Sequence, residues 1–146
     1  MKKICSVLFM PLLMILLLVV PVKGASEWEE FKTLRGNVYS LKTGIKYTTN
    51  AIAQVWVKTV YSDIGRERQI QYMKKQGLST EKEWLKLSDR LSLVEVDCKQ
   101  EKIRVLYLTY YDADGGILHN QSSSEAEWRS IVKDSTFDVL RKKVCK

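Results

Sequence analysis

An unbroken apolar run from Val7 to Val22, directly behind Lys2 and Lys3, limits what this chain can form more than any other feature. A positively charged start, a hydrophobic run and small residues after it are typical of a secretory signal peptide. We expect cleavage after Gly24 or after Ala25. The run is shorter than the ~20 residues that usually span a membrane. An uncleaved membrane anchor is the alternative interpretation.

Removal of residues 1–24 leaves residues 25–146, a length that suits one hydrophobic core and a single domain. Both prolines lie in the leader, so no proline-rich linker divides the rest. Loss of Lys2, Lys3 and Lys23 lowers the net charge from +7 by three, to +4. Acidic and basic residues are interleaved through the remainder, which favours an ordinary soluble surface over nucleic-acid binding. We expect an exported protein, located in the periplasm, at the cell surface or outside the cell.

The expected chemical state of the cysteines also depends on whether the protein is exported. Cys5 precedes the apolar run, whereas the lipid-modified cysteine of a lipoprotein follows it, so no lipid anchor is predicted. Cys98 and Cys145 remain, and an even pair in an oxidising compartment favours a disulfide. Such a bridge would contribute about 4 kcal/mol by the chain-entropy model. Two thiols used for metal binding or catalysis are the alternative, but His119 is the only histidine and no CxxC pair occurs.

Alternating apolar and polar residues predict a largely antiparallel sheet. The predicted strands are residues 29–34, 37–42, 54–61, 90–98, 102–111 and 117–120. Gly36 divides the first two into a hairpin, and Asp112–Gly116 forms the turn before the last strand. The strand over 102–111 is apolar on both faces from Val105 onward, which predicts a central place in the sheet.

Two segments predict helices. After Asp134, Ser135 is placed to cap a helix with Asp138 at the capping-box position. Its apolar stripe consists of Phe137, Leu140 and Val144, and Cys145 lies at the edge of that stripe. Residues 64–76 form a weaker helical pattern that ends at Gly77. We therefore predict an α+β fold, an antiparallel sheet of about five to six strands with a disulfide-linked C-terminal helix packed on it.

Catalytic and metal-binding patterns are sparse, and we predict no catalytic residue, no metal ligand and no cofactor. His119 is followed by Ser122–Ser124, but no G-x-S-x-G motif is present. Asp112-Ala-Asp-Gly115 resembles the start of a calcium loop, yet Gly116 stands where another oxygen ligand is needed. A turn is the favoured interpretation of that segment. A small periplasmic hydrolase that uses His119 is the enzymatic alternative.

A basic, aromatic segment offers the best binding candidates, which are Arg66, Arg68, Lys74, Lys75 and Tyr72. It could meet an acidic partner such as a sulfated polysaccharide, although Glu67 interrupts it and a solvated helix face is the alternative. Trp84, in the amphipathic stretch Glu83–Leu87, is the first candidate for an exposed aromatic anchor.

Several short motifs, in this order and spacing, resemble the surface-adhesin protein E family of Gram-negative bacteria. They are Val55-Trp-Val-Lys58, Glu95-Val-Asp-Cys98, Tyr111-Asp-Ala-Asp-Gly115, Trp128-x-x-Ile131, Asp134-Ser135 and Val144-Cys145. The resemblance implies an exported domain with a mostly antiparallel sheet, a C-terminal helix and a disulfide between Cys98 and Cys145. Its namesake binds host extracellular-matrix and plasma proteins and can dimerise.

We therefore expect a non-enzymatic, exported, adhesin-like binding domain with a protein or extracellular-matrix ligand and no membrane span after cleavage. Binding would use the exposed face or an edge of the sheet, or the segment Ile64–Leu87. A structural or assembly protein of the bacterial envelope, acting as a homodimer, is the alternative from another functional class.

Overall fold

A computed structural model describes residues 27–49, 51–78 and 82–145. The expected signal peptide at residues 1–24, and Cys5 within it, lie outside the described residues. The strands are β1 (Trp28–Leu34), β2 (Asn37–Lys42), β3 (Lys46–Tyr47), β4 (Ile52–Val60), β5 (Leu87–Asp97), β6 (Lys102–Asp112), β7 (Ile117–Ser122) and β8 (Arg129–Ser130). The helices are α1 (Asp63–Lys75), the 3₁₀ helix η1 (Lys82–Lys86) and α2 (Thr136–Val144).

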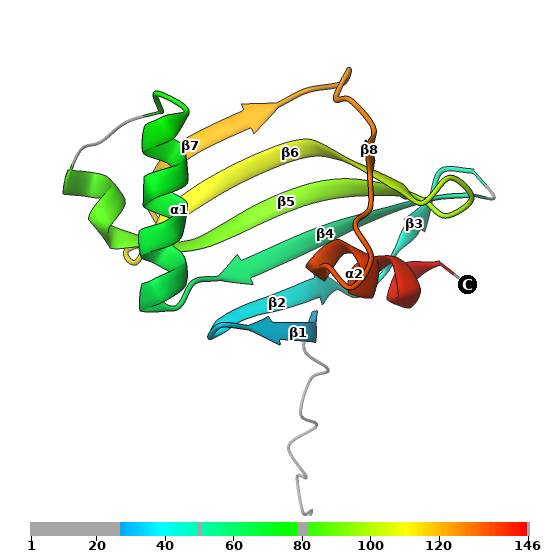
Figure 1. The fold of residues 1–146 in the computed structure, drawn as a ribbon, viewed down its shortest axis with the longest axis horizontal. Helices are drawn as coiled ribbons and strands as arrows, with labels where there is room; N and C mark the ends of the chain where they lie inside the picture. Colours follow the sequence, from blue (N-terminus) through cyan, green and yellow to red (C-terminus); the bar gives the residue numbers. More distant parts are fainter. Residues whose placement is uncertain (1–26, 50, 79–81, 146) are drawn as a thin grey trace, which may run out of the picture.

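The strands form one antiparallel sheet of eight strands with the order β1-β2-β4-β5-β6-β7 (Figure 1). Short β3 pairs with β4, and short β8 pairs with β6. The six predicted strands are confirmed, and the structure adds β3 and β8. β6 has a neighbour on each side, as its apolar sequence predicted, but β4 and β5 occupy the middle of the order. The predicted α+β class is confirmed.

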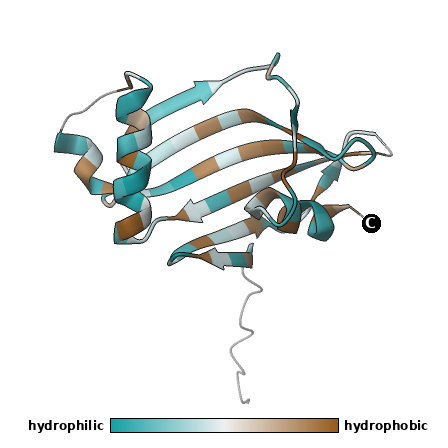
Figure 2. Ribbon diagram, viewed as in Figure 1, coloured by the Kyte–Doolittle hydropathy of each residue, from teal (hydrophilic) through white to brown (hydrophobic). Residues whose placement is uncertain are grey.

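Both α helices lie on the same face of the sheet, α1 across one end of the long strands and α2 nearer the other end (Figure 1). Under α2, Leu140 and Val144 pack against Val55, Val57 and Val94 in the larger apolar cluster. Figure 2 shows how hydrophobic and polar residues alternate along the strands, which is why one face of β4 is buried.

A second, smaller cluster lies under α1. Ile70 and Met73 of α1 contact Trp84 of η1, Leu87 of β5 and Tyr110 of β6. The two clusters are therefore at different ends of the same sheet face, each under its own helix.

The C-terminal helix begins as the sequence predicted. The Ser135 hydroxyl accepts a hydrogen bond from the Asp138 amide at 3.2 Å. The Asp138 carboxylate accepts one from the amide of Asp134 at 3.0 Å, one residue before the usual capping-box partner. Leu140 and Val144 are fully buried, so the predicted apolar stripe faces the sheet.

The disulfide between Cys98 and Cys145 is confirmed, with an S–S distance of 2.01 Å and a Cα–Cα distance of 5.5 Å. It joins the residue after β5 to the residue after α2. One covalent bond thus fixes the C-terminal helix to a central strand.

Candidate functional site

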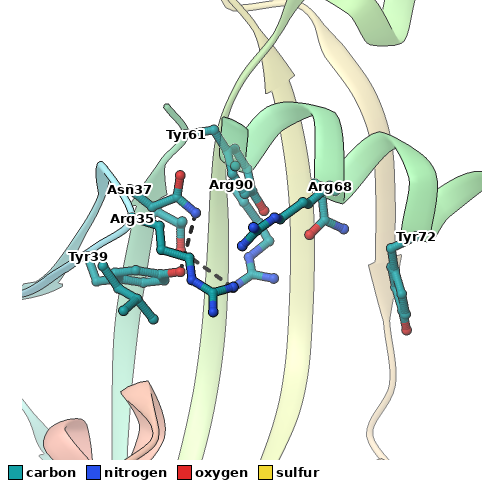
Figure 3. A pocket seen from close by; sticks show the side chains of 11 residues that line it. Arg35, Asn37, Tyr39, Tyr61, Arg68, Tyr72 and Arg90 are labelled. Atoms are coloured by element: carbon teal, nitrogen blue, oxygen red, sulfur yellow. Dashed lines mark hydrogen bonds between the residues drawn. The ribbon is translucent and has the colours of Figure 1, made fainter. Parts of the chain in front are cut away.

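A cavity of about 350 Å³ lies on the helix-bearing face of the sheet, between α1 and the β1–β2 hairpin (Figure 3). Its lining includes three arginines, which come from the hairpin turn, from α1 and from β5: Arg35, Arg68 and Arg90. It also includes the tyrosines Tyr39, Tyr61 and Tyr72. We call this cavity the arginine–tyrosine pocket.

The floor of the pocket is built by strand register. Tyr39 of β2 is paired with Thr59 of β4, and Thr59 is paired with Arg90 of β5. Paired residues of neighbouring strands point to the same face, so these three side chains form a row across the sheet. Val57 and Val94, nearer α2 on that face, belong to the apolar core. The row therefore marks the point where the apolar core gives way to polar residues.

The hairpin turn is held against the start of α1. The Ser62 hydroxyl, which caps α1 by accepting from the Gly65 amide at 3.1 Å, donates to the Arg35 carbonyl at 2.9 Å. The Ser62 amide donates to the Asn37 side-chain oxygen at 2.9 Å. A β-carbon on Gly65 would lie 1.8 Å from that oxygen, so only glycine permits this approach. These contacts set one wall of the pocket.

Arg90 is the most unusual residue of the pocket. One terminal nitrogen of its guanidinium donates to the Thr59 hydroxyl at 3.4 Å. Its Nε is buried and has no hydrogen-bond partner, and within the described residues no carboxylate forms an ion pair with it. Arg90 is half-buried, and withdrawing part of a cation from water without a compensating anion is costly, so this arrangement needs an explanation beyond packing.

The guanidinium of Arg90 keeps its charge in this environment. Burial lowers its pKa, but electrostatic interaction with Tyr61 and Tyr110 and a hydrogen bond with Tyr110 leave the pKa above its usual value. Burial raises the pKa of Tyr61 well above its usual range. The buried Tyr61 hydroxyl has no hydrogen-bond partner among the residues described. The pocket therefore holds a permanent cation and a protonated hydroxyl, both of which are donors.

The wall formed by α1 contributes Arg68, Gln69 and Tyr72. Figure 3 shows the Arg68 side chain reaching from α1 toward Arg90. Gln69 donates to the Tyr110 hydroxyl at 2.9 Å, which fixes this part of the helix to β6. Tyr72 is 55% exposed and borders the opening.

Of the binding candidates predicted from the sequence, Arg68 and Tyr72 line this pocket. Arg66 instead pairs with Asp63 and donates to the Leu87 carbonyl at 3.4 Å, which joins α1 to β5. Lys74 and Lys75 are exposed in the last turn of α1 and lie outside the pocket lining.

Trp84 requires a correction. The sequence suggested an exposed aromatic anchor, but its side chain is only 3% exposed, and its ring centre lies 5.4 Å from that of Tyr110. The 3₁₀ helix turns Trp84 into the smaller cluster and leaves the adjacent Leu85 at 66% exposure. Trp84 therefore stabilises the core under α1.

The sequence did not single out Arg35, Tyr39, Tyr61 or Arg90. One signal for Arg90 was available, since in β5 it shares the alternation of the core residues Val94 and Val96. A charged residue in such a series is a candidate for a polar site. Arg35 and Arg90 line the same pocket because the β1–β2 hairpin docks against the start of α1. The periodicity of the sequence does not predict this docking.

The remaining chemical candidates lie elsewhere. His119 lies on β7, with its ring centre 6.4 Å from that of Tyr110, and does not line the arginine–tyrosine pocket. Asp112 begins the predicted turn, and its carboxylate accepts hydrogen bonds from the amides of Asp114 and Gly116 at 2.9 and 2.7 Å. Across the described ranges, no group of three His, Cys, Asp or Glu residues could hold a metal ion. Across the same ranges, no helix is long and apolar enough to cross a membrane.

Comparison with known proteins gives one match. No curated protein and no solved structure matches this chain. A family model, described as surface-adhesin protein E, matches residues 28–146, which run from the first residue of β1 through α2 and include both bridged cysteines. The chain therefore belongs to the surface-adhesin protein E family.

Proposed function

We propose that this chain is an exported, non-enzymatic binding domain that attaches to a protein ligand at the cell envelope or in the extracellular matrix. The observation that carries the proposal is the family match over residues 28–146. The Cys98–Cys145 bridge supports export, because disulfides persist in oxidising compartments. The apolar leader ahead of the domain supports it as well.

The outer surface of α1 is the proposed contact region. Tyr72 and Ile64 are 55% and 59% exposed on this helix, Lys75 is exposed three residues after Tyr72 on the same side, and Lys74 is exposed further around the helix. Tyrosine anchors bury a large area with little loss of rotamer freedom, and lysines at the rim speed association with acidic partners. The arginine–tyrosine pocket opens next to this surface and extends it.

The test is direct binding of the oxidised, exported chain to a panel of purified extracellular-matrix proteins, such as laminin, fibronectin and collagen, measured by surface plasmon resonance. We expect saturable binding to at least one of them. The variant Lys74→Glu/Lys75→Glu is expected to weaken that binding and make it less sensitive to salt.

A matched control reverses two exposed charges away from α1, Lys99→Glu/Lys133→Glu. It changes the net charge equally and should leave the affinity nearly unchanged. The same measurement is made with proteins extracted from the cell envelope, and absence of saturable binding both to the matrix panel and to the envelope proteins contradicts the proposed function. Equal weakening by both double variants contradicts the assignment of the contact region to α1.

A further inference from the structure

We propose that the arginine–tyrosine pocket binds a carboxylate group presented by an acidic side chain of the protein ligand, with Arg90 as its principal partner. This inference rests on the proposed function, because it assigns a residue type of the ligand to one place on the domain. The ligand group is defined by the donors that the pocket presents.

Arg90 supplies the main reason. Its guanidinium lies in the floor, where it donates to Thr59 at 3.4 Å and interacts with the Tyr110 hydroxyl, and its buried Nε has no hydrogen-bond partner within the described part of the chain. A guanidinium offers parallel donors that match the two oxygens of a carboxylate. A bound carboxylate would supply the anion that this half-buried cation lacks.

The other donors surround the same space. Arg35 and Arg68 project into the pocket from the hairpin turn and from α1 (Figure 3). The Tyr61 hydroxyl also lines the pocket and is buried with no partner in the described ranges. The lining contains no Asp or Glu, so every side chain that an anion would meet in the pocket is cationic or neutral. A pocket of this composition attracts an acidic group rather than a basic one.

The rim favours a peptide over a polysaccharide. Leu34 and Tyr72 border the pocket and are 42% and 55% exposed. Leu34 is an aliphatic rim residue, which suits the apolar side chain next to an acidic residue in a protein better than the hydroxyl- and sulfate-bearing surface of a sulfated sugar chain. A volume of about 350 Å³ accommodates an acidic side chain together with part of its neighbour. We therefore infer an acidic residue adjacent to an apolar one.

The probe is the blocked dipeptide N-acetyl-Leu-Glu-amide, with N-acetyl-Leu-Gln-amide as its neutral counterpart. Binding to the oxidised, exported chain is followed by NMR, using the Nε–H signals of the arginines. We expect saturable shifts of the Arg90 signal with the Glu dipeptide, and binding roughly tenfold weaker with the Gln dipeptide, because a charge-assisted hydrogen bond is lost.

Two variants and one control locate the binding. Arg90→Met and Arg68→Gln are each expected to weaken binding of the Glu dipeptide about tenfold, while Arg129→Gln, which removes one exposed charge on β8, should not. Arg90→Met should also leave the melting temperature unchanged or higher, because it removes a half-buried cation that has no ion-pair partner among the described residues. Loss of binding without loss of stability separates a binding role from a structural one, and Arg68→Gln keeps the test valid if Arg90→Met does not fold.

Equal affinity for the two dipeptides, or equal affinity of wild type and both pocket variants, overturns the inference. Tighter binding of inorganic phosphate, inorganic sulfate or a heparin fragment than of the Glu dipeptide overturns the assignment to a protein carboxylate. Matrix-protein binding that survives both pocket variants overturns this inference and leaves the proposed function standing. If no protein of the panel or of the envelope extract binds while the Glu dipeptide still shifts the Arg90 signal, the proposed function is refuted and the pocket assignment is not.

Discussion

The hydroxyl of Ser62 donates to the backbone carbonyl of Arg35 at 2.9 Å, and so connects the first residue before α1 to the turn between β1 and β2. The same oxygen caps α1 by accepting from the Gly65 amide. One side chain thus fixes both the start of the helix and the position of the hairpin. The walls of the arginine–tyrosine pocket depend on this connection.

Replacement of Ser62 by alanine should lower the free energy of unfolding by about 1–2 kcal/mol, because the helix loses its N-cap and the turn loses its contact. Urea denaturation followed by circular dichroism measures this change. Ser124→Ala, at an exposed turn position, serves as the control and should change stability by less than about 0.5 kcal/mol. Equal effects of the two substitutions would show that the Ser62 contacts contribute little.

Removal of the disulfide through Cys98→Ser/Cys145→Ser should lower the free energy of unfolding by about 4 kcal/mol, because the bridge closes a loop with a sequence separation of 47. For a domain of this size, that corresponds to a fall in melting temperature of roughly 10–20 °C. Differential scanning calorimetry of the variant and of wild type, each with and without reductant, provides the measurement. Reductant should shift only wild type, and an unshifted wild type would refute the predicted contribution.

Stability below neutral pH should depend on Asp138. Hydrogen bonds from Lys142, from the Asp134 amide and from Arg141 lower the pKa of this carboxyl well below its usual value. A carboxyl whose pKa is lowered by folding stabilises the folded state above its unfolded pKa of about 3.9. That contribution is lost as the pH falls through the folded pKa. We expect the unfolding free energies of wild type and Asp138→Asn to differ at pH 7 and to converge in acid.

The control for this comparison is Glu125→Gln, at an exposed turn position. Its difference from wild type should be small and should vary little between pH 7 and pH 3. A constant difference between wild type and Asp138→Asn over the same range would contradict the role given to Asp138.

Burial of Trp84 and exposure of Tyr72 predict opposite consequences for two aromatic substitutions. Trp84→Ala should lower the free energy of unfolding by about 3–5 kcal/mol, because it leaves a cavity under α1. Tyr72→Ala should change it by less than about 0.5 kcal/mol and should instead weaken ligand binding. Chemical denaturation measures the stability of the two variants, and surface plasmon resonance measures their ligand binding. A Trp84→Ala variant as stable as wild type would contradict the placement of this residue in the core.

Alternation and capping made most of the fold predictable. Val55 and Val57 occupy alternate, buried positions of β4, and Ser135 with Asp138 marked the start of α2, because these signals depend only on neighbouring positions. Trp84 was misplaced because Trp84 and Leu85 are adjacent apolar residues in a short 3₁₀ helix. Either one could face the core, and the smaller cluster around Tyr110 decides which one does.

The pocket was less predictable than the fold. Arg68 and Tyr72 were recognised because they lie in one basic, aromatic helix, where local composition is informative. Arg35 and Arg90 come from a turn and a strand far apart in the sequence, and only the packed structure brings them into one pocket. Such a grouping depends on strand order and on the Ser62 contacts, which no local pattern encodes.

The bridge between Cys98 and Cys145 turns the last third of the domain into a covalent ring that contains β6, β7, β8 and α2. The connection between β7 and β8, residues 123–128, is part of that ring and includes exposed positions open to proteases. A protease that cuts there once leaves two pieces still attached to each other. The two pieces separate only when a reducing agent is added, so a nicked domain stays in one piece under oxidising conditions.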